Sequence, residues 1–239
     1  MGKGDCTTMS TIAADNGLAR SAALFSSVVG KKIVMAVTGV ILSGFVLGHM
    51  IGNLQIYMGP ERINAYGRFL HSNMELLWPV RIVLLASVAL HILSAVQLII
   101  LNNFKARPVG YLKKTSIAAD YAARTMVWSG PIVACFVVYH LLHFTTGTAH
   151  PNFVEGDVYH NVVTGFQVPA AAIFYIVGNI LLAMHLYHGV WSMLQTLGVS
   201  HPRYTPWLKA LAKVYGIVIG AGNCSIPLAV MTGLLTLKA

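Results

Sequence analysis

Five long apolar runs, separated by shorter polar segments, dominate the pattern of hydrophobic and polar positions along this chain. Each run holds about 20 residues or more, which is the length an α-helix needs to cross a hydrocarbon core of about 30 Å. The pattern therefore predicts an all-α fold, a transmembrane bundle of five helices. The predicted spans are Ile33–Tyr57, Leu77–Leu101, Met126–Thr146, Val168–Thr196 and Leu208–Leu235.

The polar segments complete this outline. Residues 1–30 are small and polar, and no cleavable signal peptide is evident, so we expect an N-terminal cytoplasmic segment before a single helical domain at 31–239. The segment Gly59–Glu75 has a proline near its start and apolar residues at helical spacing, which predicts a short helix on the membrane surface.

The composition supports a polytopic membrane protein. Hydrophobic residues make up 56% of the 239 residues and charged residues only 10%, and the mean hydropathy is +0.68. Ordinary soluble domains carry roughly 25% charged residues. Cys6, Cys135 and Cys224 lack metal-ligand spacing, so neither disulfides nor iron–sulfur ligation is expected.

The lysines and arginines fall mainly on one side of the predicted spans, which fixes the orientation by the positive-inside rule. Twelve lie at the N-terminal end, between the second and third spans, and around the start of the fifth: Lys3, Arg20, Lys31, Lys32, Lys105, Arg107, Lys113, Lys114, Arg124, Arg203, Lys209 and Lys213. Only Arg62, Arg68, Arg81 and Lys238 lie on the other side. We therefore expect a cytoplasmic N-terminus and an outer C-terminus, and we interpret the net charge of +9 as membrane topology, not nucleic-acid binding.

Six histidines lie inside the predicted spans, where each needs compensation in an apolar medium. They are His49, His91, His140, His143, His185 and His188. At a rise of 1.5 Å per residue, His49 lies about 25 Å beyond Lys32 and His140 about 24 Å beyond Arg124, both in the outer half. His91 lies about 21 Å below Leu77 and His185 about 24 Å below Pro169, both in the inner half. Depth therefore predicts two pairs, His49 with His140 and His91 with His185.

Two imidazoles at one depth suit bis-axial ligation of haem. Zinc would need further ligands, and no intramembrane carboxylate or cysteine cluster supplies them. A Cys-x-x-Cys-His motif is absent, so the expected cofactor is non-covalent haem b. Gly44 and Gly48 beside His49, and Gly189 beside His185, would make room for a macrocycle; close helix packing explains glycines equally well.

Three further polar residues in the spans are open to two interpretations each. His143 and His188 follow a paired histidine by three residues, and either supports a ligand, a propionate or a proton path, or replaces its neighbour as ligand. Arg81 either snorkels to the outer surface or pairs with a propionate of the outer haem.

The chain resembles the cytochrome b membrane anchor of succinate dehydrogenase and fumarate reductase, of the five-helix, two-haem type. The resemblance runs from about Ser26 to Leu235. It is carried by the run from Gly48 to Gln55, by Asn64-Ala65-Tyr66 with Phe69-Leu70, by Leu90-His91, by Tyr139-His140, and by His185-x-x-x-Gly189-Val190-Trp191. In that family the first and third of these histidines bind the distal haem and the second and fourth the proximal one, which favours His140 over His143 and His185 over His188.

The resemblance implies a respiratory electron conduit in a bacterial cytoplasmic membrane. A separate flavoprotein subunit would oxidise succinate, and an iron–sulfur subunit would pass electrons through the inner and outer haems to a quinone, with menaquinone as the family-level expectation. The basic segments 103–124 and 198–213 would dock the iron–sulfur subunit, and the complex could form a higher oligomer. Candidate quinone contacts are Asn53, Gln55, His71 and Glu75 near the outer haem, or Ser27, Lys31 and Gln97 at the inner face; the outer set is preferred.

One position departs from part of the family. Some two-haem fumarate reductases carry a glutamate two residues before the fourth ligand, thought to pass protons, and here this position is Ala183. Electron transfer across the membrane without that route would feel the membrane potential, about 2.3 kcal/mol per charge per 100 mV.

Two other functions fit the sequence less well. A haem b anchor for a hydrogenase or formate dehydrogenase would also place histidine pairs in a four- or five-helix bundle. A histidine-relay transporter is disfavoured, because the spans hold no Asp or Glu and no inverted repeat with paired broken helices is apparent.

Overall fold

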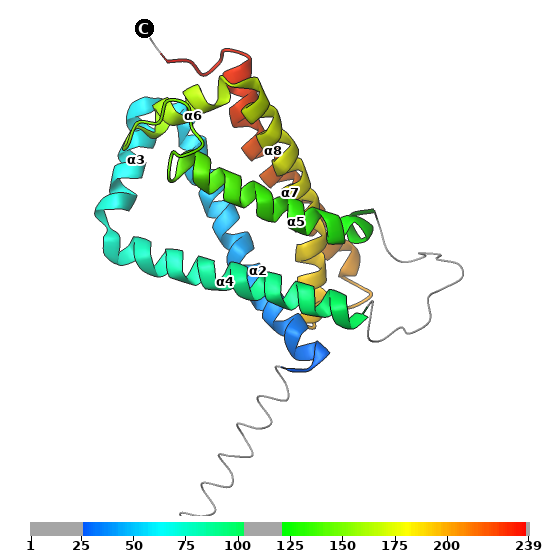
Figure 1. The fold of residues 1–239 in the computed structure, drawn as a ribbon. Coiled ribbons are helices and arrows are strands. Elements are labelled where there is room, and N and C mark those ends of the chain that lie inside the picture. The colour runs from blue at the N-terminus through cyan, green and yellow to red at the C-terminus, as the bar shows by residue number, and fades with distance from the viewer. Residues whose placement is uncertain (1–25, 103–120, 238–239) are drawn as a thin grey trace, which may run out of the picture.

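The computed structural model describes residues 26–102 and 121–237, with the backbone alone for 121–125. In these residues the chain forms seven α-helices and one short 3-10 helix and no strand, which confirms the predicted all-α class (Figure 1). Five segments are long and apolar enough to cross a membrane: Val28–Met58, Met74–Ile100, Met126–Phe144, Pro169–Thr196 and Thr205–Met231. The N-terminal segment up to residue 25 and most of the basic segment 103–124 lie outside the described residues.

The long helices begin and end close to the predicted limits. They are α2 (Val28–Asn53), α4 (Met74–Ile100), α5 (Tyr121–Phe144), α7 (Pro169–Thr196) and α8 (Thr205–Met231). The largest differences are at both ends of α2, at the start of α5 and at the end of α8. Helix α2 begins at Val28, before Lys31 and Lys32, because the Ser27 hydroxyl accepts a hydrogen bond from the Gly30 N–H at 3.0 Å and caps the helix. Helix α8 ends early because Gly233 takes a φ of 76° just after it.

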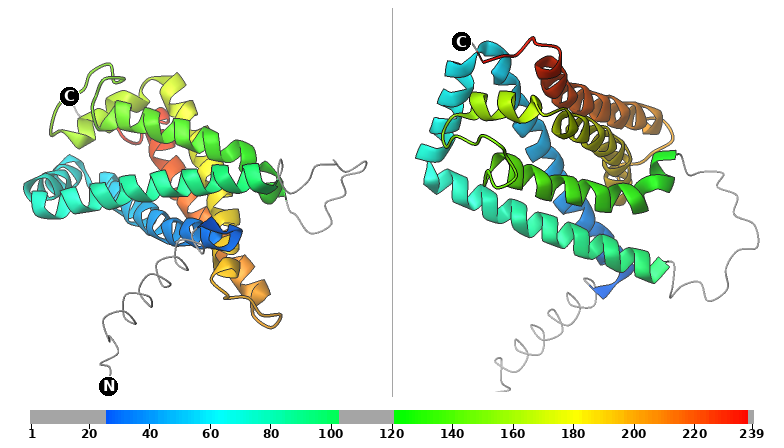
Figure 2. Two further views of the ribbon diagram at one scale, coloured as in Figure 1. Left: turned by 60° about the horizontal axis from the view of Figure 1, so that its bottom comes forward. Right: turned by 45° about the horizontal axis from the view of Figure 1, so that its top comes forward.

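Two short helices lie at one end of the long ones (Figures 1 and 2). Helix α3 (Pro60–Ser72) forms in the predicted segment, after a 3-10 turn η1 (Leu54–Met58). Helix α6 (Val158–Phe166) was not predicted; it lies between the third and fourth predicted spans. Asp157 caps it by accepting a hydrogen bond from the His160 N–H at 3.0 Å.

The side chain of Asn64 joins these two short helices. Its Nδ2 donates to Asp157 Oδ1 at 2.9 Å, and its Oδ1 accepts from the Tyr159 N–H at 3.0 Å. This contact gives a structural reason for the Asn64-Ala65-Tyr66 motif. It also ties the segment between α2 and α4 to the segment between α5 and α7.

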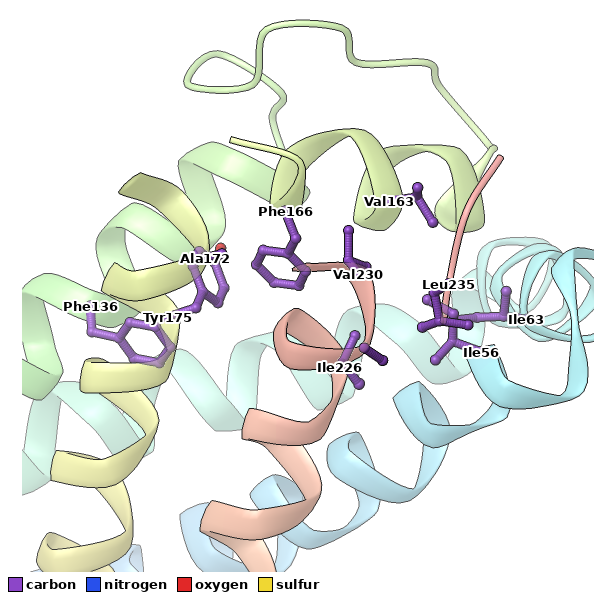
Figure 3. Packing of buried hydrophobic residues seen from close by; sticks show 11 residues of the cluster. Ile56, Ile63, Phe136, Val163, Phe166, Ala172, Tyr175, Ile226, Val230 and Leu235 are labelled. Atoms are coloured by element: carbon purple, nitrogen blue, oxygen red, sulfur yellow. The ribbon is translucent and has the colours of Figure 1, made fainter. Parts of the chain in front are cut away.

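The largest apolar core lies at the same end, beneath α3 and α6 (Figure 3). Its members come from η1, α3, α5, α6, α7 and α8 and from the chain after α8: Ile56, Ile63, Phe136, Val163, Phe166, Ala172, Tyr175, Ile226, Ala229, Val230 and Leu235. Away from this end many large apolar side chains on α4, α5 and α8 are exposed, as expected for helices that face lipid.

The packing partners of the long helices define where a site can form. Helix α4 packs on α2, α5 packs on α7, α2 packs on α7, and α8 packs along α7 (Figures 1 and 2). Within the described ranges, α2 and α5 do not pack closely against each other, and neither do α4 and α7.

Candidate functional site

The structure brings together the two histidine pairs that depth predicts. The ring centroids of His49 on α2 and His140 on α5 lie 5.6 Å apart. Those of His91 on α4 and His185 on α7 lie 6.4 Å apart. In each pair the imidazoles meet across two helices whose backbones stay apart.

Hydrogen bonds at Nδ1 orient the inner pair. The buried Thr38 hydroxyl lies 3.1 Å from His91 Nδ1 and donates its own hydrogen to the Val34 carbonyl at 2.8 Å. A hydroxyl has one hydrogen, so this oxygen accepts from an Nδ1–H on His91. This assignment gives His91 a protonated Nδ1 and leaves Nε2 with the lone pair that binds a metal.

His185 is held in a similar way. The buried Ser129 hydroxyl lies 3.5 Å from His185 Nδ1 and 3.5 Å from the Met126 carbonyl, to which it donates. The arrangement again has a helical hydroxyl bonded to its own backbone and open to an Nδ1–H. Both inner imidazoles can therefore present Nε2.

The outer pair is held from one side. Tyr175 Oη lies 3.3 Å from His140 Nδ1 and 3.2 Å from His143 Nδ1, so one phenol joins the two histidines. His49 stacks on Phe45, with ring centroids 5.4 Å apart. Among the described residues no hydrogen bond reaches the His49 ring.

Several glycines near the pairs face open space. A Cβ added at Gly44, Gly48, Gly130 or Gly189 would meet no atom within 4 Å outside its own local helix. Gly52 is different, because a Cβ there would lie 2.9 Å from the Tyr66 hydroxyl. The glycines at 44, 48 and 52 therefore do not act as one stripe: the first two border open space and the third admits a tyrosine.

An apolar cavity of 380 Å³ lies between α2 and α4. It is lined by Ile41, Phe45, Pro79, Val80, Val83 and Leu84. Phe45 links it to His49, on which its ring stacks. The surroundings of the outer pair thus include apolar space, which suits a largely apolar ligand.

The remaining intramembrane polar residues fall into different surroundings. His143 is 1% exposed and stacks on His150 at a centroid distance of 4.9 Å, in a cluster beneath α6. It contacts Tyr175 and lies outside the His49–His140 pair. His188 is half-buried near His185. The Arg81 guanidinium lies over the Trp78 ring, 5.5 Å from its centroid, on the exposed side of α4.

The structure gathers only part of the predicted quinone set. Gln55 lines a cavity of 230 Å³ with Arg62, Ala65, Tyr66 and Phe69. Asn53, His71 and Glu75 are not among the residues that line it. His71 bonds to the Gly67 carbonyl at the far end of α3, and Glu75 is exposed in the first turn of α4.

The candidates at the other end are also dispersed. The Ser27 hydroxyl caps α2, the Lys31 ammonium donates to the Ser26 carbonyl, and Gln97 is exposed on α4.

Ala183 lies in the contact between α7 and α8. A Cβ at Gly216 would lie 2.7 Å from the Ala183 carbonyl oxygen, and a Cβ at Gly220 would lie 2.9 Å from the Ala183 Cβ. Helix α8 is therefore close against α7 at this position.

Sequence reasoning missed Thr38, Ser129 and Tyr175, the partners of three paired histidines. Each is a hydroxyl residue inside an apolar helix, where it needs a hydrogen-bond partner. Such hydroxyl residues were the feature of the sequence from which these partners could have been predicted. The helix rotation that aims each hydroxyl at a histidine was not available from spacing alone.

The pair geometry fits a bis-imidazole metal site. A metal–imidazole nitrogen bond is about 2 Å long, so two rings on opposite sides of one metal have centroids roughly 6 Å apart. The observed distances of 5.6 Å and 6.4 Å bracket this value. The glycines beside the pairs have no packed neighbour that would obstruct a larger group there.

Fold and site together define the class: an all-helical protein, compatible with an integral membrane location, that carries two histidine pairs between its apolar helices. No protein-family model, curated protein or solved structure matches the chain.

Proposed function

We propose that this chain is the membrane-anchor cytochrome b of a succinate:quinone oxidoreductase, with two b haems. The observation that carries the proposal is the pair of facing imidazoles at two levels, with Nδ1 of three rings engaged by hydroxyl groups. Such engagement fixes the tautomer that directs Nε2 at a metal.

Each residue then has a defined task. His49 and His140 hold the outer haem, and His91 and His185 hold the inner one. Each haem, when bound, supplies a one-electron couple. Thr38 and Ser129 orient the inner ligands. Gln55 and the cavity around it, next to Arg62 and Tyr66, form the preferred quinone contact.

The distribution of basic residues supports an orientation and a docking face for this proposal. The N-terminus faces the cytoplasm and the C-terminus lies outside, in a bacterial inner membrane. The cytoplasmic face, including Arg203, Lys209 and Lys213, receives an iron–sulfur subunit that is itself joined to a flavoprotein subunit. Reporter fusions after residue 102 and at the C-terminus test this: a cytoplasmic C-terminal reporter would contradict the orientation.

Haem content tests the cofactor. The purified chain should show a b-type reduced-minus-oxidised spectrum and about two haems, one for each bis-imidazole pair. His49→Ala and His91→Ala should each lose one haem, the outer and the inner respectively. The matched control is His201→Ala, because His201 is exposed in the segment between α7 and α8 and should leave both haems in place. A haem-free wild-type chain would overturn the proposal.

Reduction by substrate separates the proposed complex from the hydrogenase and formate dehydrogenase types. In membranes, succinate should reduce the haems, and the chain should co-purify with a flavoprotein subunit. Reduction by hydrogen or formate, with a nickel or molybdenum subunit, would retain the cytochrome and reject the succinate partner.

A further inference from the structure

Tyr175 occupies the junction between the outer histidine pair and a second, buried histidine cluster. Its side chain is 4% exposed, within the core at the α3–α6 end. Its hydroxyl lies between His140 Nδ1 at 3.3 Å and His143 Nδ1 at 3.2 Å. One phenolic oxygen therefore contacts two imidazole nitrogens.

The direction of these hydrogen bonds follows from counting hydrogens. If His140 presents Nε2 to a metal, its Nδ1 carries a hydrogen and donates it to Tyr175 Oη. The phenol hydrogen is then directed at His143 Nδ1, which accepts it. The chain of donors runs from His140 to Tyr175 to His143, with no nitrogen left to compete for the same hydrogen.

Packing fixes the position of His143, at the far end of this series of hydrogen bonds. His143 is 1% exposed and stacks on His150, itself 8% exposed. His150 Nδ1 accepts from the Asn152 N–H at 3.1 Å, and its Nε2 donates to the Asn161 carbonyl at 2.8 Å. Gly165 admits both rings, because a Cβ there would lie 2.9 Å from each of them. His143 therefore has little freedom to turn away from Tyr175.

We propose that Tyr175 is a positioning residue for His140, and that His143 sets the direction of the Tyr175 hydroxyl. This inference rests on the proposed function, since it gives His140 a haem to bind. It makes the outer haem the one whose properties depend on the α6 end of the protein. His49, on the opposite side, has no comparable partner in the described part of the chain.

The electronic consequence has a definite sign. An acceptor on Nδ1–H increases the basicity of the imidazole and thereby favours the ferric haem. Removal of that acceptor should raise the midpoint potential of the outer haem and leave the inner haem unchanged. The effect of His143 is indirect, because its acceptance polarises the phenol, and it should be smaller.

Redox titration of the purified holoprotein tests the proposal with three variants. Tyr175→Phe keeps the aromatic ring and removes the hydroxyl, and should shift the outer haem by about tenfold in its reduction equilibrium, which is about +59 mV for one electron. His143→Phe should shift it in the same direction by less. Tyr139→Phe is the control: its ring also stacks on His143, with centroids 5.3 Å apart, but no hydrogen bond from its hydroxyl appears among the described residues.

His49→Ala identifies which titration belongs to the outer haem, because it should lack that haem. An outer midpoint that is unchanged in both Tyr175→Phe and His143→Phe would overturn the proposal, as would an equal shift of both haems. If Tyr175→Phe does not fold, His143→Phe decides alone. A wild-type protein without haem would instead reject the proposed function, so the two failures are distinguishable.

Discussion

The contact between α7 and α8 and the stretch of α2 beside His49 use glycine in opposite ways. At the first, Gly216 and Gly220 bring α8 so close to α7 that an added Cβ would lie under 3.0 Å from Ala183. At the second, Gly44 and Gly48 on α2 have nothing within 4 Å of an added Cβ. Helices α7 and α8 pack along each other, whereas α2 reaches α5 only through the rings of His49 and His140 in this region.

Glycine in an apolar helix can therefore have two different structural roles. Between α7 and α8 it replaces side-chain contact with backbone contact, as small residues do between membrane helices. Beside the histidine pairs it leaves volume that the described residues do not fill. Where such volume lies beside a histidine pair, it supports the proposed haem site.

The same substitution at both places tests most directly whether the two sets of glycines differ in packing. Gly216→Ala should destabilise the protein by about 1–3 kcal/mol, because the new Cβ meets a backbone oxygen that cannot move alone. Gly44→Ala should be neutral or gain up to about 1 kcal/mol, from the higher helix propensity of alanine. Thermal unfolding in detergent, followed by circular dichroism, measures both. Equal losses in the two variants would show that both glycines are packed.

A larger side chain tests what the open volume is for. Gly48→Leu should weaken outer haem binding at least tenfold, about 1.4 kcal/mol, because leucine fills the space beside His49. Gly130→Leu, next to Ser129, should instead weaken the inner haem. Haem content and the two midpoint potentials distinguish these outcomes. If both variants keep both haems, the glycines face lipid.

The smallest expected effect concerns the inner pair. Thr38→Val removes the acceptor for His91 Nδ1–H and should speed haem loss about two- to tenfold, from a hydrogen bond worth about 0.5–1.5 kcal/mol. The rate of haem transfer to a haem-free acceptor protein measures it. Thr196→Val is matched, since Thr196 also bonds to the carbonyl four residues earlier but adjoins no paired histidine. A similar rate in both variants would remove Thr38 from the site.

Most of the fold could be predicted because long apolar runs indicate long helices whatever their tertiary surroundings. The ends of α2 and α8 were harder, since single residues such as Ser27 and Gly233 decide them. Helix α6 was not predicted because nine residues show little hydrophobic periodicity. Its burial also depends on tertiary contacts, with α3 through Asn64 and with the apolar core beneath it.

The candidate site could be predicted in depth but not in rotation. The rise of a helix converts sequence position into height, and this was enough to match His49 with His140 and His91 with His185. Which side of a helix faces which neighbour depends on tertiary packing. For that reason His143 could not be separated from His140 by spacing, although the structure directs it toward His150.

The Asn64 contact has a consequence for biogenesis. Its two partners, Asp157 and Tyr159, follow it by 93 and 95 residues, and each histidine pair joins residues a similar distance apart. Helices α2 and α4 are therefore synthesised well before any of these partners exists. The Asn64 contact and both histidine pairs can form only after the second half of the chain has been synthesised, and in the proposed cytochrome neither haem could acquire its second ligand before then.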